Sequence, residues 1–137
     1  MRPNEPPHHR THRPQPWWAT AILAVMGLGL PAQAEIVDIR FDAERRFTHR
    51  FEVAAGKFAE ACGQIPRGSA VQWRFQASAP MNFNIHYHEG KAVTYPEKRE
   101  GRAQGDGTLQ VTVDEAYCWM WTNKTGQPAA VTVELQR

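Results

Sequence analysis

Apolar and polar residues alternate with a period of two through most of the chain after residue 35. The clearest case is VQWRFQA (71–77), where Val71, Trp73 and Phe75 share one parity and the residues between them are polar. Successive side chains of a β-strand point to opposite faces of a sheet, so the pattern predicts half-buried strands. The other strands are expected at 36–42, 47–53, 81–88, 91–95, 108–113, 116–122 and 130–136.

Turn residues separate these segments. Pro66-Arg67-Gly68-Ser69 joins two of them, and His88-Glu89-Gly90-Lys91 is typical of a tight hairpin. The polar stretch 96–107 carries charges of alternating sign and three glycines, which predicts a mobile, solvated loop. Residues 55–62 fit either a helical turn or a strand with a bulge at Gly56.

Seven or eight short strands in one small domain predict an all-β fold, an antiparallel β-sandwich. The inward parity of the strands supplies its core. The expected core residues are Phe51, Val71, Trp73, Phe75, Phe83, Ile85, Tyr117, Trp119, Val131 and Val133.

The first 34 residues have the pattern of a signal peptide. A basic leader precedes the uncharged apolar run 17–30, and Ala32-Gln33-Ala34 fits the small-x-small cleavage site, so we expect a cut after Ala34. An uncleaved anchor is the weaker alternative, since a spanning helix needs about 20 apolar residues. The mature chain, 35–137, is then one periplasmic or secreted domain without a stable membrane anchor.

Removing the leader balances the charge of the protein. It takes away three of the 16 Lys and Arg residues and one of the 14 Asp and Glu residues, which leaves 13 of each. No basic stripe survives in the mature chain, so we expect no nucleic-acid partner.

Both cysteines, Cys62 and Cys118, lie in the mature part. Export delivers them to an oxidising compartment, where two cysteines are expected to form a disulfide. Closing a loop of about 56 residues stabilises a fold by about 4 kcal/mol in the chain-entropy model.

The stretch 51–77 resembles the opening of the GOLD (Golgi dynamics) domain, the lumenal β-sandwich of vesicle cargo receptors. The family pattern is a strand, a small-Gly step, a Cys-containing strand, a basic-Gly turn and an alternating strand. Its counterparts here are Phe51–Val53, Ala55-Gly56, Cys62, Arg67-Gly68 and Val71–Ala77, followed late in the chain by the aromatic strand of Tyr117 and Trp121 that closes on Asn123.

The resemblance covers about residues 47–137 and implies a GOLD-like or jelly-roll-like binding fold. It also implies a disulfide between the early and the late cysteine, but no catalytic residues. Two departures limit it. Cys118 lies two residues earlier relative to Asn123 than the family's late cysteine, and no coiled-coil stalk or sorting tail follows, so cargo-receptor trafficking is not carried over.

Four residues of metal-binding type occur in two pairs with the same spacing. His86 and His88 share a strand face with Cα atoms about 6.5–7 Å apart, and Cys118 and Met120 repeat the spacing farther along. Together they would suit copper. Cupredoxins place a further His after the Cys, which this chain lacks, and a disulfide would remove the Cys118 thiolate. His86 and His88 with Met120, or with a carboxylate such as Glu89, would survive it.

Two other interpretations of the histidines stay open. Asn82, Asn84, His86 and His88 form either an ordinary polar strand face or a row of hydrogen-bonding groups for an extended peptide or glycan. Such a row would respond to pH between about 5 and 8 through its imidazoles. The aromatic residues of 116–122 are expected in the core rather than on a stacking platform.

No catalytic motif is visible, so we expect a non-enzymatic protein. The predicted function is an exported recognition or accessory module, monomeric or weakly dimeric, for an unidentified protein, peptide or small ligand. No cofactor is expected; the alternative is a periplasmic copper-binding protein. Asn123-Lys124-Thr125 matches a glycosylation sequon, but a turn is the stronger interpretation.

Overall fold

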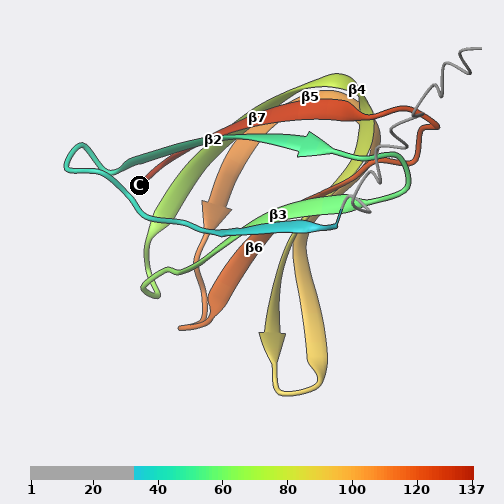
Figure 1. Ribbon diagram of the computed structural model, residues 1–137. Coiled ribbons are helices and arrows are strands. Elements are labelled where there is room, and N and C mark those ends of the chain that lie inside the picture. Colours follow the sequence, from blue (N-terminus) through green and yellow to red (C-terminus); the bar gives the residue numbers. More distant parts are fainter. Residues whose placement is uncertain (1–32) are drawn as a thin grey trace, which may run out of the picture. The chain divides into compact units, whose positions relative to one another are not determined.

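The computed structural model describes residues 33–137, which form an all-β fold (Figure 1). Within these residues no helix has the length and apolar character needed to cross a membrane. The predicted signal peptide, 1–34, lies outside the described residues except for its last two positions. The strands are β1 (Glu35–Asp38), β2 (Arg46–Val53), β3 (Phe58–Gln64), β4 (Ala70–Glu89), β5 (Ala92–Gln110), β6 (Ala116–Thr122) and β7 (Ala129–Gln136).

The strands form one folded-over sheet in the order β1-β3-β6-β4-β7-β2, with β5 beside β4. Strand β4 belongs to both layers, because 72–77 pair with β7 and 82–87 pair with β6. Its pairing with β5 is interrupted between Gln76 and Met81. Pro80 lies in this gap and lacks the N–H that a ladder needs. The strand crosses there from one layer to the other, which gives the sandwich-like near-barrel of Figure 1.

The interior contains every predicted core residue. All ten are at most 3 % exposed. Aromatic rings from both layers meet at the centre: the Trp121 ring lies 5.8 Å from Phe51, 5.8 Å from Phe75 and 5.4 Å from Phe83. The period-two pattern therefore identified the buried face of these strands correctly.

The prediction of a mobile loop at 96–107 is wrong, because β5 runs through it without a break. Two of its three glycines serve close packing. A Cβ on Gly105 or Gly107 would lie 2.7 Å from a ring atom of Phe75 or Trp73, respectively. The Arg99 guanidinium lies 4.9 Å over the Trp73 ring, so a charged side chain covers the edge of the core.

One further detail differs from the sequence expectation, and one open alternative is decided. β1 pairs with β3 in parallel, so the sheet is mixed rather than purely antiparallel. The intervening β2 belongs to the other layer and makes the long crossover that a parallel pair requires. Of the two alternatives for 55–62 the strand is observed, because β3 begins at Phe58 after a turn in which Gly56 has a φ of 72°.

The predicted turn at Asn123 is confirmed. Its side chain is fully buried, donates to the carbonyls of Val53 (3.0 Å) and Gln127 (2.8 Å), and accepts from the Thr125 amide (2.9 Å). In the folded domain the amide of this sequon is committed to holding the turn.

Candidate functional site

The outer surface of the β3–β6–β4 layer gathers chemically active side chains from three strands. Register puts Cys62, Cys118 and His86 in one row across the sheet, and Glu60, Met120 and Asn84 in the next row. His88 follows His86 on the same side of β4. The histidine face consists of Glu60, Cys62, Asn84, His86, His88, Cys118 and Met120.

The predicted disulfide is present at the centre of this face. The sulfurs of Cys62 and Cys118 are bonded at 2.08 Å, and their Cα atoms lie 4.1 Å apart as direct partners on neighbouring strands. While this bond is intact, Cys118 offers no thiolate, so the thiolate version of the predicted copper site is not formed.

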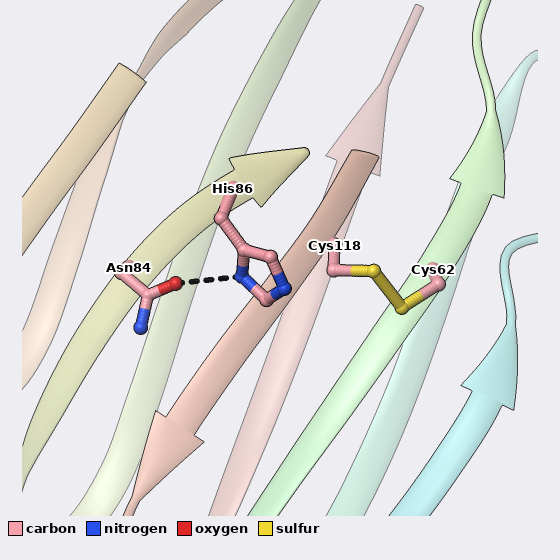
Figure 2. The surroundings of a disulfide bond; sticks show 4 residues. All are labelled: Cys62, Asn84, His86 and Cys118. Atoms are coloured by element: carbon pink, nitrogen blue, oxygen red, sulfur yellow. Dashed lines mark hydrogen bonds between the residues drawn. A yellow bond between two sulfur atoms is a disulfide. The ribbon is translucent and has the colours of Figure 1, made fainter. Parts of the chain in front are cut away.

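His86 is held in one orientation beside the disulfide. It is 7 % exposed, and its Nδ1 lies 2.8 Å from Oδ1 of Asn84. Because an amide oxygen can only accept, Nδ1 donates, and in the neutral ring Nε2 keeps its lone pair. Figure 2 shows the ring pointing from β4 across β6 toward Cys118, so the free nitrogen faces the sulfur atoms.

Glu60 completes a three-residue cluster. Ligand atoms of Glu60, His86 and Cys118 all lie within 4.8 Å of one another. Burial raises the pKa of the Glu60 carboxyl, and the nearby His88 partly opposes this rise. Burial lowers the pKa of His86, and His88 lowers it further. A neutral imidazole is the form that binds metals, so His86 is prepared for that role at neutral pH.

The raised pKa of Glu60 has a consequence for the free energy of unfolding. In the folded state the Glu60 carboxyl keeps its proton at pH values above the ordinary pKa of 4.5, whereas in the unfolded chain it has already ionised. The free energy of unfolding therefore falls as the pH rises through and above 4.5. Glu60→Gln removes this penalty. We expect the variant to be more stable than the wild type at pH 7, by no more than about 1 kcal/mol because solvent screens a half-exposed group.

The check is urea unfolding of both proteins across the acidic and neutral range. At pH about 3.5, where the wild-type carboxyl is protonated in both states, the two free energies of unfolding should coincide. A Glu60→Gln variant that is less stable than wild type at neutral pH would contradict the burial argument.

The residues of the predicted polar row, Asn82, Asn84, His86 and His88, lie on β4, but most of them are not accessible to a ligand. Asn84 and His86 are 8 % and 7 % exposed, whereas His88 is exposed. The Asn82 Oδ1 accepts from the Gly101 amide at 3.1 Å, so this side chain ties β4 to β5.

Sequence reasoning missed Glu60. It lies two residues before Cys62 and therefore on the same face, and this parity was the signal that could have found it. Met120 is half-buried and lies directly opposite Glu60 in β3 and Asn84 in β4.

The β4–β5 hairpin continues this face beyond the other strands (Figure 1). Two apolar side chains are unusually exposed there, Val93 at 39 % and Tyr95 at 50 %. Val93 is the direct partner of His88, and the Tyr95 ring lies 5.8 Å from the ring of His86. We call Val93, Tyr95 and His88 the hairpin patch.

The opposite layer has a different character. A groove of about 530 Å³ crosses its outer face and is lined mainly by polar side chains, among them Thr48 and Thr108. Its central charges satisfy each other, since Nε of Arg74 lies 2.9 Å from the Glu134 carboxylate.

No protein-family model matches the chain, and a search of curated proteins finds no relative. The fold is similar to several solved structures. PliG of Aeromonas hydrophila, a periplasmic lysozyme inhibitor of g-type lysozyme, has a TM-score of 0.53 and 13 % identity over 76 % of this chain and 98 % of that one.

Two other structures have similar scores. The pre-peptidase C-terminal domain of Bacillus anthracis collagenase has a TM-score of 0.55 and 7 % identity over 79 % of this chain and 99 % of that domain. The Yersinia pseudotuberculosis-derived mitogen has a TM-score of 0.53 and 10 % identity over 66 % and 84 %. At such identities the likeness establishes the fold alone: this is a β-sandwich-type domain.

Proposed function

We propose that this protein is an exported, non-catalytic recognition module that binds a protein partner through the hairpin patch. The observation that carries the proposal is the clustering of exposed apolar side chains. Of the three large apolar side chains that are exposed in the described residues, two lie together on the hairpin. Isolated exposed apolar residues are ordinary, whereas neighbouring ones beside polar groups are typical of binding surfaces.

The composition of the patch fits protein recognition. Tyr95 is a rigid, amphipathic ring, and the Lys98 ammonium lies 5.4 Å from its centre, at the polar margin of the patch. Tyrosine anchors surrounded by polar groups are common at interface hot spots. Tyr95 is 50 % exposed, so a partner can reach this side chain.

The solved structures with a similar fold support a protein-binding role. PliG is named as an inhibitor of a lysozyme, so a fold of this kind serves protein binding in at least one periplasmic protein. The disulfide and the leader pattern support export. The GOLD domain is also a binding fold, and the proposal includes that this domain is related to it.

The test is photocrosslinking in cells that make the protein. A photoreactive amino acid replaces Tyr95 or Val93, and matched controls carry it at the exposed positions Thr48 and Thr108 on the other layer. We expect one discrete protein adduct from the hairpin positions and none from the controls. Adducts from the control positions alone, or none from any position, would refute the hairpin patch as the binding surface.

Copper binding by the histidine face is the second candidate. It is favoured by the convergence of Glu60, His86 and Cys118 within 4.8 Å, with Met120 directly opposite Glu60. With the disulfide intact, the ligands would be His86 and His88 with Met120 or Glu60, a set of nitrogen, sulfur and oxygen donors compatible with copper.

Metal titration of the oxidised protein decides this candidate. The wild type should bind Cu(I) or Cu(II) with a Kd below about 10 μM, and His86→Ala/His88→Ala should lose that binding. His49→Ala, which changes a histidine outside the face, is the matched control and should bind like wild type. Weaker binding, or equal binding by the double variant, would remove the copper hypothesis.

A further inference from the structure

Three potential zinc ligands lie together at the disulfide, Glu60, His86 and Cys118, and Cys62 is bonded to the last of them. The Cys118 sulfur is covalently joined to that of Cys62, and ligand atoms of Glu60 and His86 lie within 4.8 Å of it and of each other. In the oxidised protein neither sulfur is a thiolate, so the two best ligands of the four are blocked.

We propose that reduction of the Cys62–Cys118 disulfide opens a zinc site formed by both cysteines, His86 and Glu60. A dithiol reductant transfers two electrons and two protons to the disulfide and becomes a disulfide itself. Zinc then binds the two sulfurs and releases their two protons to solvent. The oxidised face and the reduced face are therefore different metal-binding surfaces.

The backbone geometry suits a single ion. The cysteine Cα atoms lie 4.1 Å apart on neighbouring strands, so rotation of the two side chains separates the sulfurs without moving the strands. In tetrahedral zinc sites with bonds of about 2.0–2.3 Å, ligand atoms lie about 3.5 Å apart. The ligand atoms of Glu60, His86 and Cys118 already lie within 4.8 Å of one another and have to approach by about 1 Å, and Cys62 joins them by rotation of its side chain.

The imidazole is already supported for this role. Asn84 accepts from Nδ1 of His86 at 2.8 Å, which leaves Nε2 as the ligand atom and fixes the ring toward the sulfurs (Figure 2). Metal-binding histidines usually have such a partner on the second nitrogen, and losing it weakens metal affinity about 10–100-fold. Two thiolates, one imidazole and one carboxylate are ligands that zinc takes readily in four-coordinate sites.

The test compares the purified protein oxidised and after anaerobic reduction with a phosphine. Zinc is measured by equilibrium dialysis and thermal unfolding, and cobalt(II) serves as a spectroscopic probe of thiolate binding. We expect one zinc per reduced chain, bound at least about 100-fold more tightly than by the oxidised protein. Zinc should raise the Tm of the reduced protein, and cobalt should give thiolate charge-transfer absorption.

Variants separate this site from a simple dithiol. His86→Ala and Glu60→Gln should each weaken zinc binding by at least about 10-fold, and Asn84→Ala should weaken it about 10–100-fold, whereas His49→Ala should not. Unchanged zinc affinity in His86→Ala and Glu60→Gln would overturn the inference. So would a reduced protein that unfolds and is not refolded by zinc. Equal affinity in the oxidised protein would also overturn it, while leaving the copper candidate standing.

Discussion

The Cys62→Ala/Cys118→Ala double variant should lose about 4 kcal/mol of its free energy of unfolding. The disulfide closes a loop with a sequence separation of 56 residues, and opening it restores conformational entropy to the unfolded chain. Small domains have only about 5–15 kcal/mol in total. We therefore expect the variant to be folded but marginal, with a Tm lowered by roughly 15–30 °C.

Urea unfolding followed by circular dichroism measures this loss. Both cysteines are replaced together, because a single substitution leaves a free thiol that can join two molecules. Wild type reduced by a phosphine without metal is the matched control and should lose a similar amount. A loss below about 1 kcal/mol in both samples would contradict the expected loop-closure stabilisation.

Trp121→Ala should lose about 3–5 kcal/mol, the range for removing a large buried aromatic side chain. Trp121 is fully buried and has three phenylalanine rings within 5.8 Å: Phe51 in β2, and Phe75 and Phe83 in the two halves of β4. Its removal opens a cavity where the two layers meet, which the surrounding rings can fill only partly.

Two matched substitutions give the comparison. Trp121→Phe keeps an aromatic ring in the cluster and should lose clearly less than Trp121→Ala. Tyr95→Ala removes an aromatic side chain that is 50 % exposed and should change the free energy of unfolding by only about 0.5 kcal/mol. If Trp121→Ala were as mild as Tyr95→Ala, Trp121 would not be at the centre of the core.

The strands and their buried faces were predictable because side-chain alternation is local. Each of the ten predicted core residues could be assigned from the parity of its own strand. The connection between 77 and 81 was not predictable in this way. Ser78-Ala79-Pro80 has the composition of a turn, yet β4 passes through it as one strand that changes layers.

The error at 96–107 has a related cause. The charged residues of β5 alternate in sign, which is typical of a solvated loop, and Gly105 and Gly107 suggest flexibility. The two glycines are instead required because the rings of Phe75 and Trp73 press against the strand. The need for glycine at these positions comes from the partner strand β4, where Trp73 lies opposite Gly107. The two residues are some 30 positions apart in sequence, so no local pattern predicts it.

The candidate site was predictable in part. The two-residue spacing of His86 and His88 and the presence of two cysteines in the expected mature chain pointed to the right strands. The row that joins Cys62, Cys118 and His86 depends on the register of β3, β6 and β4, which pairs residues far apart in sequence. Without that register, the burial of His86 and the role of Glu60 could not be inferred.

The central claim is that Asn84 orients His86 so that its free Nε2 is directed at the disulfide and Glu60, while burial and the nearby His88 keep the ring neutral. Long-range proton–nitrogen NMR of the oxidised protein across a pH titration tests it most directly. His86 is expected to carry its proton on Nδ1 at neutral pH and to titrate below the ordinary histidine pKa of 6.5. A proton on Nε2, or a pKa at or above that value, would contradict it.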